Sequence, residues 1–278
     1  TPGHSSAASD VYKRQTLATL PAVDFPKIEG GETDVVVSVA QADLRMLIDG
    51  VGFAMAQQDV RYFLNGMLFE VTEDHLRTVA TDGHRLALST KGCSLESPIA
   101  ERRQAIVPRK AVLELGRLLD EEDEDIRIQL GTNHLRVSKG AYTLTTKLVD
   151  GQFPDYDKVV PKDASRTLVG DRDTLRQGFQ RASILSNEKY RGVRLTIAAE
   201  QLTIQANNPE QEEAEEVVPV EFNGNKLEIG FNVSYLLDVL GVIADDQVKL
   251  SLSDANSSAL LEASGSDDAV YVVMPMRL

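Results

Sequence analysis

Residues 44–51 (LRMLIDGV) and residues 175–182 (LRQGFQRA) decide the fold, because they are two copies of one pattern. The matching positions are Leu44, Arg45, Ile48 and Val51 in the first copy and Leu175, Arg176, Phe179 and Ala182 in the second. The match extends outward until residues 42–83 and 173–209 read as one pattern written twice. Such self-similarity predicts a repeated structural unit, and a function that neighbouring copies build together.

The downstream segments repeat as well. A helix-like run at 108–119 is followed by strand-like residues 126–130, and the pair is echoed by 232–243 and 248–252. A chain of 278 residues is long enough for two filled cores. We therefore expect two domains, 33–158 and 159–278. Residues 1–15 lack the pattern of either repeat, and we interpret them as a disordered or foreign tail.

The periodicity predicts an α+β fold. Helix signals have apolar residues at i, i+3, i+4 and i+7, as at 44–51 and 233–240. The expected strands are Val35–Val39, Met67–Val71, Leu76–Ala80, Ile126–Leu130, Leu135–Ser138, Tyr142–Lys147, Thr167–Gly170, Val193–Ile197, Leu202–Ala206, Val217–Glu221, Lys226–Gly230 and Ala269–Met274. Turns of a few residues join consecutive strands, so the sheets should be antiparallel. Each domain is then two helices packed on antiparallel sheet, itself an internal duplication.

Composition excludes several classes of protein. The net charge of −14, from 29 basic and 43 acidic residues, argues against attraction to nucleic acid or anionic membranes along the whole sequence. No apolar run approaches the length of a membrane helix, and we expect no membrane partner. The single cysteine, Cys93, cannot form an internal disulfide, so we expect a cytoplasmic protein. We interpret Cys93 as a small buried or surface side chain and not as a reactive thiol.

Charge is unevenly distributed along this acidic chain. The helix segments carry Arg45, Arg109, Lys110, Arg117, Arg172, Arg176 and Arg181. These residues are either ordinary solvated helix faces or a positive lining that contacts phosphates without reading bases. The acidic run 120–125 is interpreted as a solvated loop, since it lacks the glycine and terminal glutamate of a calcium loop. The acidic run 210–216 is either an edge that discourages strand pairing or a docking surface for a basic partner.

Two segments are candidates for a site. Thr81–Leu86 holds Asp82, His84 and Arg85 close together, which suggests either a catalytic base with its orienting group or a turn between strands. We favour the turn, because no phosphate loop, metal-ligand spacing or nucleophile motif accompanies it. Hence no catalytic residue, metal or cofactor is expected. The C-terminal residues 271–278 (YVVMPMRL) are apolar to the end, which suits either core packing or an adaptable binding pocket.

Several motifs, in this order, resemble the β subunit of bacterial DNA polymerase III, the sliding clamp. They are QDVRYFLNGMLFE from Gln58, TVATDGHRLAL (78–88), VPRKAVLEL (107–115), KLVDGQFPDYDKVVP (147–161), ILSNEKYRGVRL (184–195), NNPEQEEAEE (207–216), FNVSYLLDVL (231–240) and YVVMPMRL (271–278). The resemblance covers nearly everything from Thr16 onward. It corresponds to the middle and last of three domains, with residues 16–32 as a connector from a first domain that is missing here.

The resemblance implies a DNA-clamp fold and a function that is not enzymatic. Clamps of this family form a head-to-tail homodimeric ring around duplex DNA, without sequence specificity. They act as processivity factors in the cytoplasm, at the nucleoid during replication. They recruit the DNA polymerase III alpha subunit, the clamp loader and other proteins carrying a clamp-binding motif. A hydrolase centred on Asp82 and His84 and a peptide-binding scaffold that never encircles DNA are the rival interpretations.

The resemblance also implies three sets of site residues. The partner peptide-binding pocket would comprise Leu64, Thr81, Gly83, His84, Arg85, Leu86, Pro154, Lys158, Val159, Asn232, Tyr235, Ser258, Val272, Val273, Met274, Pro275, Met276 and Arg277. Residues facing DNA would be Gln58, Arg61, Tyr62, Arg45, Arg109, Lys110 and Arg176, and residues at the protomer interface would be Arg181, Ile184, Leu185, Glu210, Glu212, Glu213, Glu215 and Glu216. Lys158 stands where an arginine is frequent in the family, so a bidentate contact is not expected there.

Overall fold

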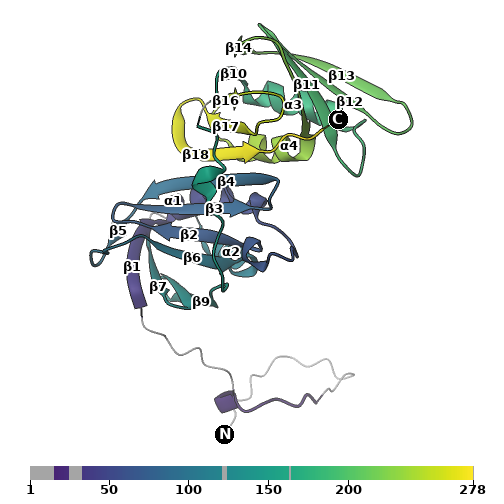
Figure 1. Cartoon of the computed structure of the whole chain (residues 1–278). Helices are drawn as coiled ribbons and strands as arrows, with labels where there is room; N and C mark the ends of the chain where they lie inside the picture. The colour runs from purple at the N-terminus through teal and green to yellow at the C-terminus, as the bar shows by residue number, and fades with distance from the viewer. Residues whose placement is uncertain (1–15, 25–32, 121–123, 163, 278) are drawn as a thin grey trace. The chain divides into compact units, whose positions relative to one another are not determined.

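The computed structural model describes residues 16–24, 33–120, 124–162 and 164–277 (Figure 1). Contacts divide the chain into two units, Thr1–Gly30 and Gly31–Leu278. The described part of the first unit contains one 3-10 turn, Ala22–Asp24. The expected tail 1–15, residues 25–32 of the expected connector and residues 121–123 of the acidic run lie outside the described residues.

The first repeat runs from Thr33 to Lys147. Its strands are β1 (Thr33–Ala40), β2 (Gly66–Val71), β3 (His75–Thr81), β4 (Arg85–Gly92), β5 (Ser94–Leu95), β6 (Arg103–Pro108), β7 (Asp125–Gly131), β8 (His134–Lys139) and β9 (Tyr142–Lys147). Its helices are α1 (Gln41–Asp49) and α2 (Arg109–Leu118), with 3-10 turns η2 (Gly52–Ala54) and η3 (Tyr62–Leu64). A second connecting segment, residues 148–165, joins the two repeats and is called the connector from here on. It carries the 3-10 turn η4 (Tyr156–Lys158).

The second repeat runs from Arg166 to Val273. Its strands are β10 (Arg166–Asp171), β11 (Gly192–Ala198), β12 (Gln201–Asn207), β13 (Glu213–Pro219), β14 (Glu221–Asn223), β15 (Leu227–Asn232), β16 (Gln247–Leu252), β17 (Ala259–Ala263) and β18 (Ser266–Val273). Its helices are α3 (Arg172–Ser183) and α4 (Val233–Val242). The element order is that of the first repeat, strand for strand and helix for helix, so the duplication predicted from the sequence is confirmed.

One sheet joins the two repeats. Nine strands lie in the order β14-β10-β16-β17-β18-β4-β3-β2-β6, and the β18–β4 pair crosses from the second repeat to the first (Figure 1). In this pair Val273 lies opposite Arg85 and Tyr271 opposite Ala87. The five-stranded sheet β5-β1-β7-β8-β9 and the four-stranded sheet β13-β12-β11-β15 each belong to one repeat. All the strand pairs among the described residues are antiparallel, as the short turns predict.

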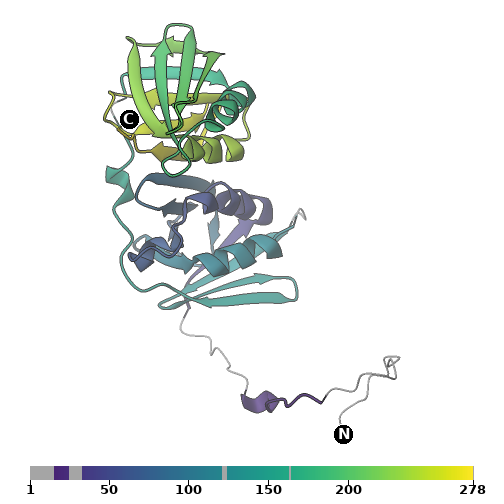
Figure 2. The same ribbon diagram turned by 90° about the vertical axis from the view of Figure 1, so that its right-hand side faces the viewer.

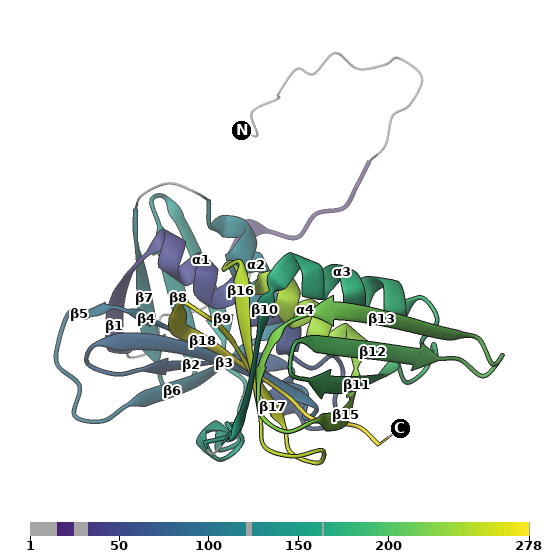
Figure 3. The ribbon, with the colours of Figure 1, turned by 90° about the horizontal axis from the view of Figure 1, so that it is seen from above.

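The helices bury one face against the sheets. Leu44 and Leu47 of α1 are fully buried, and α1 packs beside α2 as α3 packs beside α4 (Figure 2). Asp171 caps α3 by accepting a hydrogen bond from the backbone N of Thr174 at 2.7 Å. Gly178 permits close packing of α3 on β13, because a Cβ there would lie 2.7 Å from Val218 Cγ2. Figure 3 shows α3 running along the strands β11 to β13.

Four details of the sequence prediction are wrong. The expected strand Val217–Glu221 is two strands, because β13 ends at Pro219 and β14 begins at Glu221. The acidic residues 213–216, expected between strands, lie in β13 itself, where an edge strand tolerates outward carboxylates. α1 ends at Asp49, so Val51 follows the helix. Strands β4, β5, β6 and β17 were not predicted as separate elements.

Candidate functional site

A locked turn joins β3 to β4. Gly83 adopts a φ of 90°, which favours glycine. The Asp82 carboxylate accepts hydrogen bonds from the backbone N of His84 at 2.9 Å and of Arg85 at 3.1 Å. Thr81 Oγ1 donates to the Arg85 carbonyl at 2.6 Å and accepts from Gly83 N at 3.1 Å. The prediction of a turn is confirmed, and its hydrogen bonds hold His84 at the exposed tip.

The arrangement of Asp82 and His84 does not resemble a catalytic pair. A general base is oriented through a hydrogen bond to its ring, whereas Asp82 contacts His84 through the backbone N. The second carboxylate oxygen of Asp82 accepts from Arg85 Nε at 3.1 Å. The His84 ring instead lies over Tyr235, stacked with centroids 6.5 Å apart. These contacts stabilise a surface and do not prepare a proton transfer.

Arg85 connects the two repeats. Its guanidinium lies 4.5 Å from the ring centroid of Tyr235 in α4 and 5.2 Å from that of Phe53 in η2. It forms ion pairs with Asp82 and with Asp238, the latter also in α4, and donates to the Phe53 carbonyl at 3.0 Å. Only 13% of the Arg85 side chain is exposed. A cation held on so many sides gives the junction a fixed shape.

The C-terminal segment lies against the same turn. Val272 is opposite Leu86 and Val273 opposite Arg85 in the β18–β4 pair, and Met274 N donates to the His84 carbonyl at 2.9 Å. Val272 and Val273 are buried, whereas 39% of Met274 is exposed. The apolar end of the chain therefore fits both interpretations of the sequence: the buried valines fit core packing, and the exposed methionine fits a binding pocket.

Further predicted pocket residues surround this junction. Asn232 caps α4 by accepting from Ser234 N at 2.9 Å, three residues before Tyr235. Burial raises the pKa of the Tyr235 phenol. Ser258 directly precedes Ala259, which pairs with Val273. The structure thus brings together residues from three separate segments of the predicted pocket, 81–86, 232–235 and 258–276.

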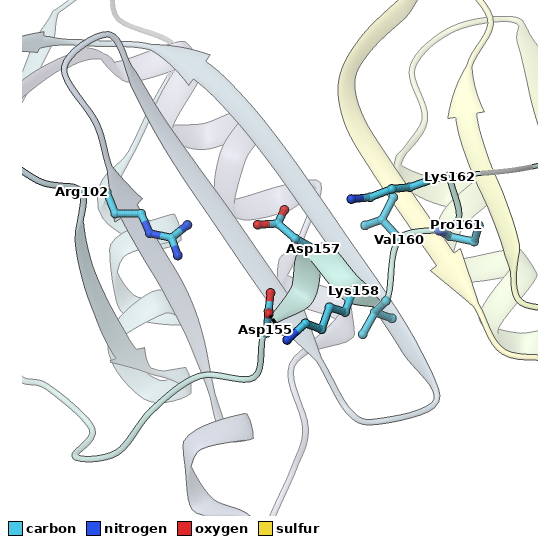
Figure 4. A pocket seen from close by; sticks show the side chains of 8 residues that line it. Arg102, Asp155, Asp157, Lys158, Val160, Pro161 and Lys162 are labelled. Atoms are coloured by element: carbon cyan, nitrogen blue, oxygen red, sulfur yellow. Dashed lines mark ion pairs between the residues drawn. The ribbon is translucent and has the colours of Figure 1, made fainter.

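The other predicted pocket residues come from η3 and the connector. Leu64 is buried, and its carbonyl accepts from Ala56 N at 3.1 Å. Val159 packs in the apolar cluster that contains Leu86. Lys158 is 82% exposed and pairs with Asp155 at 2.8 Å. Lys158 and Val159 also line a groove of about 670 Å³, together with Arg102, Asp155, Asp157 and residues 160–162 (Figure 4). Pro154 lies on the connector, two residues before η4.

Known proteins are similar in sequence to this chain over almost its whole length. The family profile described as "DNA polymerase III beta subunit, central domain" matches residues 38–155, and "DNA polymerase III beta subunit, C-terminal domain" matches 157–277. A beta sliding clamp of Pseudomonas putida is 60% identical over 267 residues, which cover 95% of this chain and 72% of the relative. The chain belongs to the beta sliding clamp family.

Other beta sliding clamps agree in sequence and structure. The Escherichia coli K12 clamp is 52% identical over 268 residues, with the same coverage of 95% and 72%. A crystal structure of the Pseudomonas aeruginosa sliding clamp with ligand superposes with a TM-score of 0.92 at 59% identity, covering 96% of this chain and 72% of that one. The 278 residues therefore hold two clamp domains, and the α+β clamp fold predicted from the sequence is confirmed.

Residues predicted to face DNA fall into two groups in this clamp-family chain. Arg61 lies against the Thr81–Arg85 turn: it pairs with Asp59 at 2.8 Å and donates to the Asp82 carbonyl at 3.2 Å. Its guanidinium lowers the pKa of Asp59 to about 2, chiefly through the side-chain hydrogen bond. The neighbouring Gln58 and Tyr62 are exposed. Arg61 is thus bound to the turn that carries predicted pocket residues, and its role in facing DNA stays a prediction.

The second group lies on the helices. Arg45 of α1 donates to the Leu119 carbonyl at 3.0 Å and pairs with Asp49 at 3.4 Å. Arg109, the first residue of α2, donates to the Met55 carbonyl at 3.4 Å. Lys110 and Arg176 are exposed. The structure therefore places exposed cations on α2 and α3, while Arg45 and Arg109 also brace the fold.

Residues predicted at the protomer interface cluster at the end of α3 and on the β12–β13 hairpin. Arg181 forms a two-fold hydrogen-bonded pair with Glu216 at 2.9 Å, which lowers the pKa of Glu216. Ile184 is 76% exposed, and Leu185 is half-buried. The remaining members, Glu210, Glu212, Glu213 and Glu215, are exposed. A single exposed apolar residue is common on protein surfaces, so the protomer interface stays a prediction.

Sequence reasoning missed Phe53 and Asp238, which hold Arg85 in place. Asp238 lies 153 positions from Arg85, so no local pattern connects them. The one sequence feature that could have pointed to Asp238 is its position three residues after Tyr235, which places both on the same face of α4. Phe53 lies in an irregular turn, and nothing in the sequence marks it as a partner of Arg85.

The described residues offer no other evident site chemistry. None of their His, Cys, Asp and Glu side chains form a group of three that could hold a metal ion. Burial raises the pKa of the half-buried Cys93 thiol, which disfavours the reactive thiolate. No helix in the described ranges has the length and apolarity needed to cross a membrane.

Proposed function

We propose that this chain carries the working surfaces of a DNA sliding clamp, the processivity factor of a replicative DNA polymerase. In this proposal the protein catalyses no reaction. Topological linkage of a closed ring to duplex DNA supplies persistence, and a peptide site recruits the DNA polymerase III alpha subunit, the clamp loader and other proteins with a clamp-binding motif. The chain acts in the cytoplasm, at the nucleoid.

The observation that carries the proposal is the junction around Arg85. Short linear motifs bind best to preformed sites, where apolar anchors supply affinity and a few fixed polar groups set orientation. Arg85 and the stacked pair of His84 and Tyr235 are held by ion pairs and ring contacts before any ligand arrives. Met274 stands exposed beside them. A sliding clamp from P. aeruginosa that is 59% identical to this chain has been solved bound to griselimycin, so that relative has a ligand site.

The net charge of −14 is compatible with work on DNA in this proposal. A closed ring does not depend on tight binding, so a few cations such as Lys110 and Arg176 suffice to line its hole. Contacts of that kind go to phosphates and carry no sequence information. The salt dependence of DNA binding should accordingly be modest.

A peptide titration tests the recruiting role. We expect a fluorescent short peptide ending in Leu-Phe to bind the wild-type chain saturably, and Met274→Asp to abolish binding because it places a charge beside the apolar anchor. Met46→Asp is the matched control, since Met46 is similarly exposed, at 49%, but lies on α1 outside the predicted site. Absence of binding by a folded wild-type chain contradicts the proposal, as does equal binding by the two variants.

The acidic charge also favours one alternative, a peptide-binding scaffold that never encircles DNA. The two functions differ in one measurement. A clamp extended by a family first domain is retained on circular DNA in a loader-dependent manner and slides off when the circle is cut. A scaffold shows no such retention, although it binds the same peptide.

A further inference from the structure

Glu70 is the one buried carboxylate among the residues that the structure describes. Only 2% of its side chain is exposed. Four groups surround it: the Tyr156 hydroxyl donates at 2.7 Å, Gln104 Nε2 at 2.6 Å, Arg102 Nη1 at 3.4 Å and Arg77 Nη1 at 3.5 Å. A buried charge is tolerated where it is paired and hydrogen-bonded in this way. A carboxylate kept at such a position needs a reason beyond packing, since an apolar residue would avoid the desolvation cost.

Tyr156 differs from the other partners in its origin. Arg77 lies in β3 and Gln104 in β6, both strands of the nine-stranded sheet that also contains Glu70. Tyr156 instead belongs to η4 in the connector between the repeats. Its hydroxyl also accepts from Arg77 Nη1 at 3.1 Å. The network around Glu70 therefore fastens the connector to the face of the sheet.

The connector reaches the candidate peptide site through the same residue. The Tyr156 carbonyl accepts hydrogen bonds from the backbone N of Val159 at 2.9 Å and of Val160 at 3.3 Å. Its ring is buried in the cluster that contains Leu86 and Val272, with Val159 packed on that cluster. One tyrosine thus contacts the buried carboxylate with its hydroxyl and a predicted site residue with its backbone.

Arg102 extends the network to the surface. Arg102 directly precedes β6, and its guanidinium points across the groove in Figure 4 towards the side where Asp155 and Asp157 lie. The pKa of Asp155 is lowered mainly by its hydrogen bond to Lys158, with a smaller contribution from the charge of Arg102. The charges of η4 are thereby linked to those around Glu70.

We propose that Glu70, acting through Tyr156, positions the connector residues that complete the peptide site. The inference rests on the proposed recruiting function and deepens it. Glu70 and Tyr156 do not touch the peptide; they hold Val159 and its neighbours in the bound arrangement before the peptide arrives. Binding to a preordered connector avoids the entropy cost of immobilising it during binding.

The test removes one hydroxyl. Tyr156→Phe keeps the ring and deletes the bond to Glu70, and we expect the Leu-Phe peptide to bind about tenfold more weakly, a change of about 1.4 kcal/mol. The loss should lie in a faster dissociation rate, because most affinity changes within one interface do. Tyr271→Phe is the matched control, because Tyr271 is also buried, at 2% exposed, but lies in β18 outside the predicted pocket. We expect this variant to bind the peptide as tightly as the wild type does.

A second readout separates positioning from general stability. The amide protons of Val159 and Val160 are bonded to the Tyr156 carbonyl, and their hydrogen exchange should accelerate in Tyr156→Phe but not in Tyr271→Phe. Glu70→Gln retains an acceptor for the tyrosine hydroxyl and should preserve more peptide affinity than Glu70→Ala.

The outcomes distinguish the two proposals. Wild-type affinity in a folded Tyr156→Phe, with binding still abolished by Met274→Asp, overturns the positioning role and leaves the recruiting function intact. Equal losses in Tyr156→Phe and Tyr271→Phe also overturn it, because a generally loosened fold then explains both. No peptide binding by the wild-type chain overturns the recruiting function, and the positioning role with it.

Discussion

Strands β4 and β13 hold the same place in their repeats, yet one is covered and the other is an edge. Each follows two strands of an antiparallel meander, β2 and β3 or β11 and β12. The Ala80–Ala87 pair in the first repeat corresponds to the Ala206–Ala214 pair in the second. β4 pairs on its far side with β18, whereas no described strand lies beyond β13.

The side chains follow this difference. Aligning Ala87 with Ala214 places Leu88 of β4 at the position of Glu215 in β13, and Leu86 at that of Glu213. Both leucines are buried, and both glutamates are exposed. Carboxylates on an open edge discourage pairing with another strand. Leucines on a covered strand stabilise the pairing, because it buries their apolar surface. The same position in the repeat thus holds a paired strand in one case and an open edge in the other, and the side chains differ accordingly.

The largest expected effect comes from giving β4 the residue of its counterpart. Leu88→Glu places a carboxylate without a partner at a site that is 9% exposed, and we expect it to lower the free energy of unfolding by at least about 3 kcal/mol. Urea unfolding measures the change. The reverse substitution, Glu215→Leu, should alter stability by less than about 0.5 kcal/mol because the site faces solvent. Similar losses for the two variants would show that the strands are not opposites in burial.

A smaller effect distinguishes the ion pairs beside the two strands. Arg85 is 13% exposed and contacts two carboxylates and two rings, so Arg85→Ala should lower the free energy of unfolding by about 2 kcal/mol. Arg181 is 53% exposed in its pair with Glu216, and Arg181→Ala should cost less than about 1 kcal/mol. The difference should persist in high salt, which screens the exposed pair and leaves the ring contacts of Arg85. Equal costs at both salt concentrations contradict this ranking.

The repeat made much of the fold predictable. Helical spacing located α1 to α4 within a few residues, and short turns gave antiparallel sheets. The prediction failed at β4, because Arg85–Gly92 begins with an arginine, ends in polar residues and shows no alternation of apolar and polar positions. Both faces of its centre are buried, one by the helices and one by the connector, so a period of two disappears.

The candidate site was predictable only in part. The turn residues 81–86 and the apolar terminus stand out as local patterns in the sequence. Their meeting depends on the β18–β4 pair, which joins residues about 180 positions apart and which no local pattern specifies. The partners of Glu70 illustrate the same limit, since Tyr156 lies 86 positions away. Residue types indicate what chemistry is possible, and long-range pairing decides which of them share a site.

The smallest expected effect uses Tyr271 as a probe of the covered joint. Burial alone raises the pKa of its phenol to about 12, from an ordinary value of 10.0. The folded state favours the neutral phenol, so the associated stability is complete below pH 10 and is lost as the pH rises toward 12. Near pH 11 the contribution of Tyr271 to this loss is about 1.4 kcal/mol, and Tyr271→Phe should remove that contribution while those of the buried phenols of Tyr156 and Tyr235 remain. Unfolding curves across this range, together with phenolate absorbance, measure both quantities. If Tyr271→Phe has the same alkaline slope as the wild type, solvent reaches the β18–β4 joint, and that joint is less closed than the contrast with β13 requires.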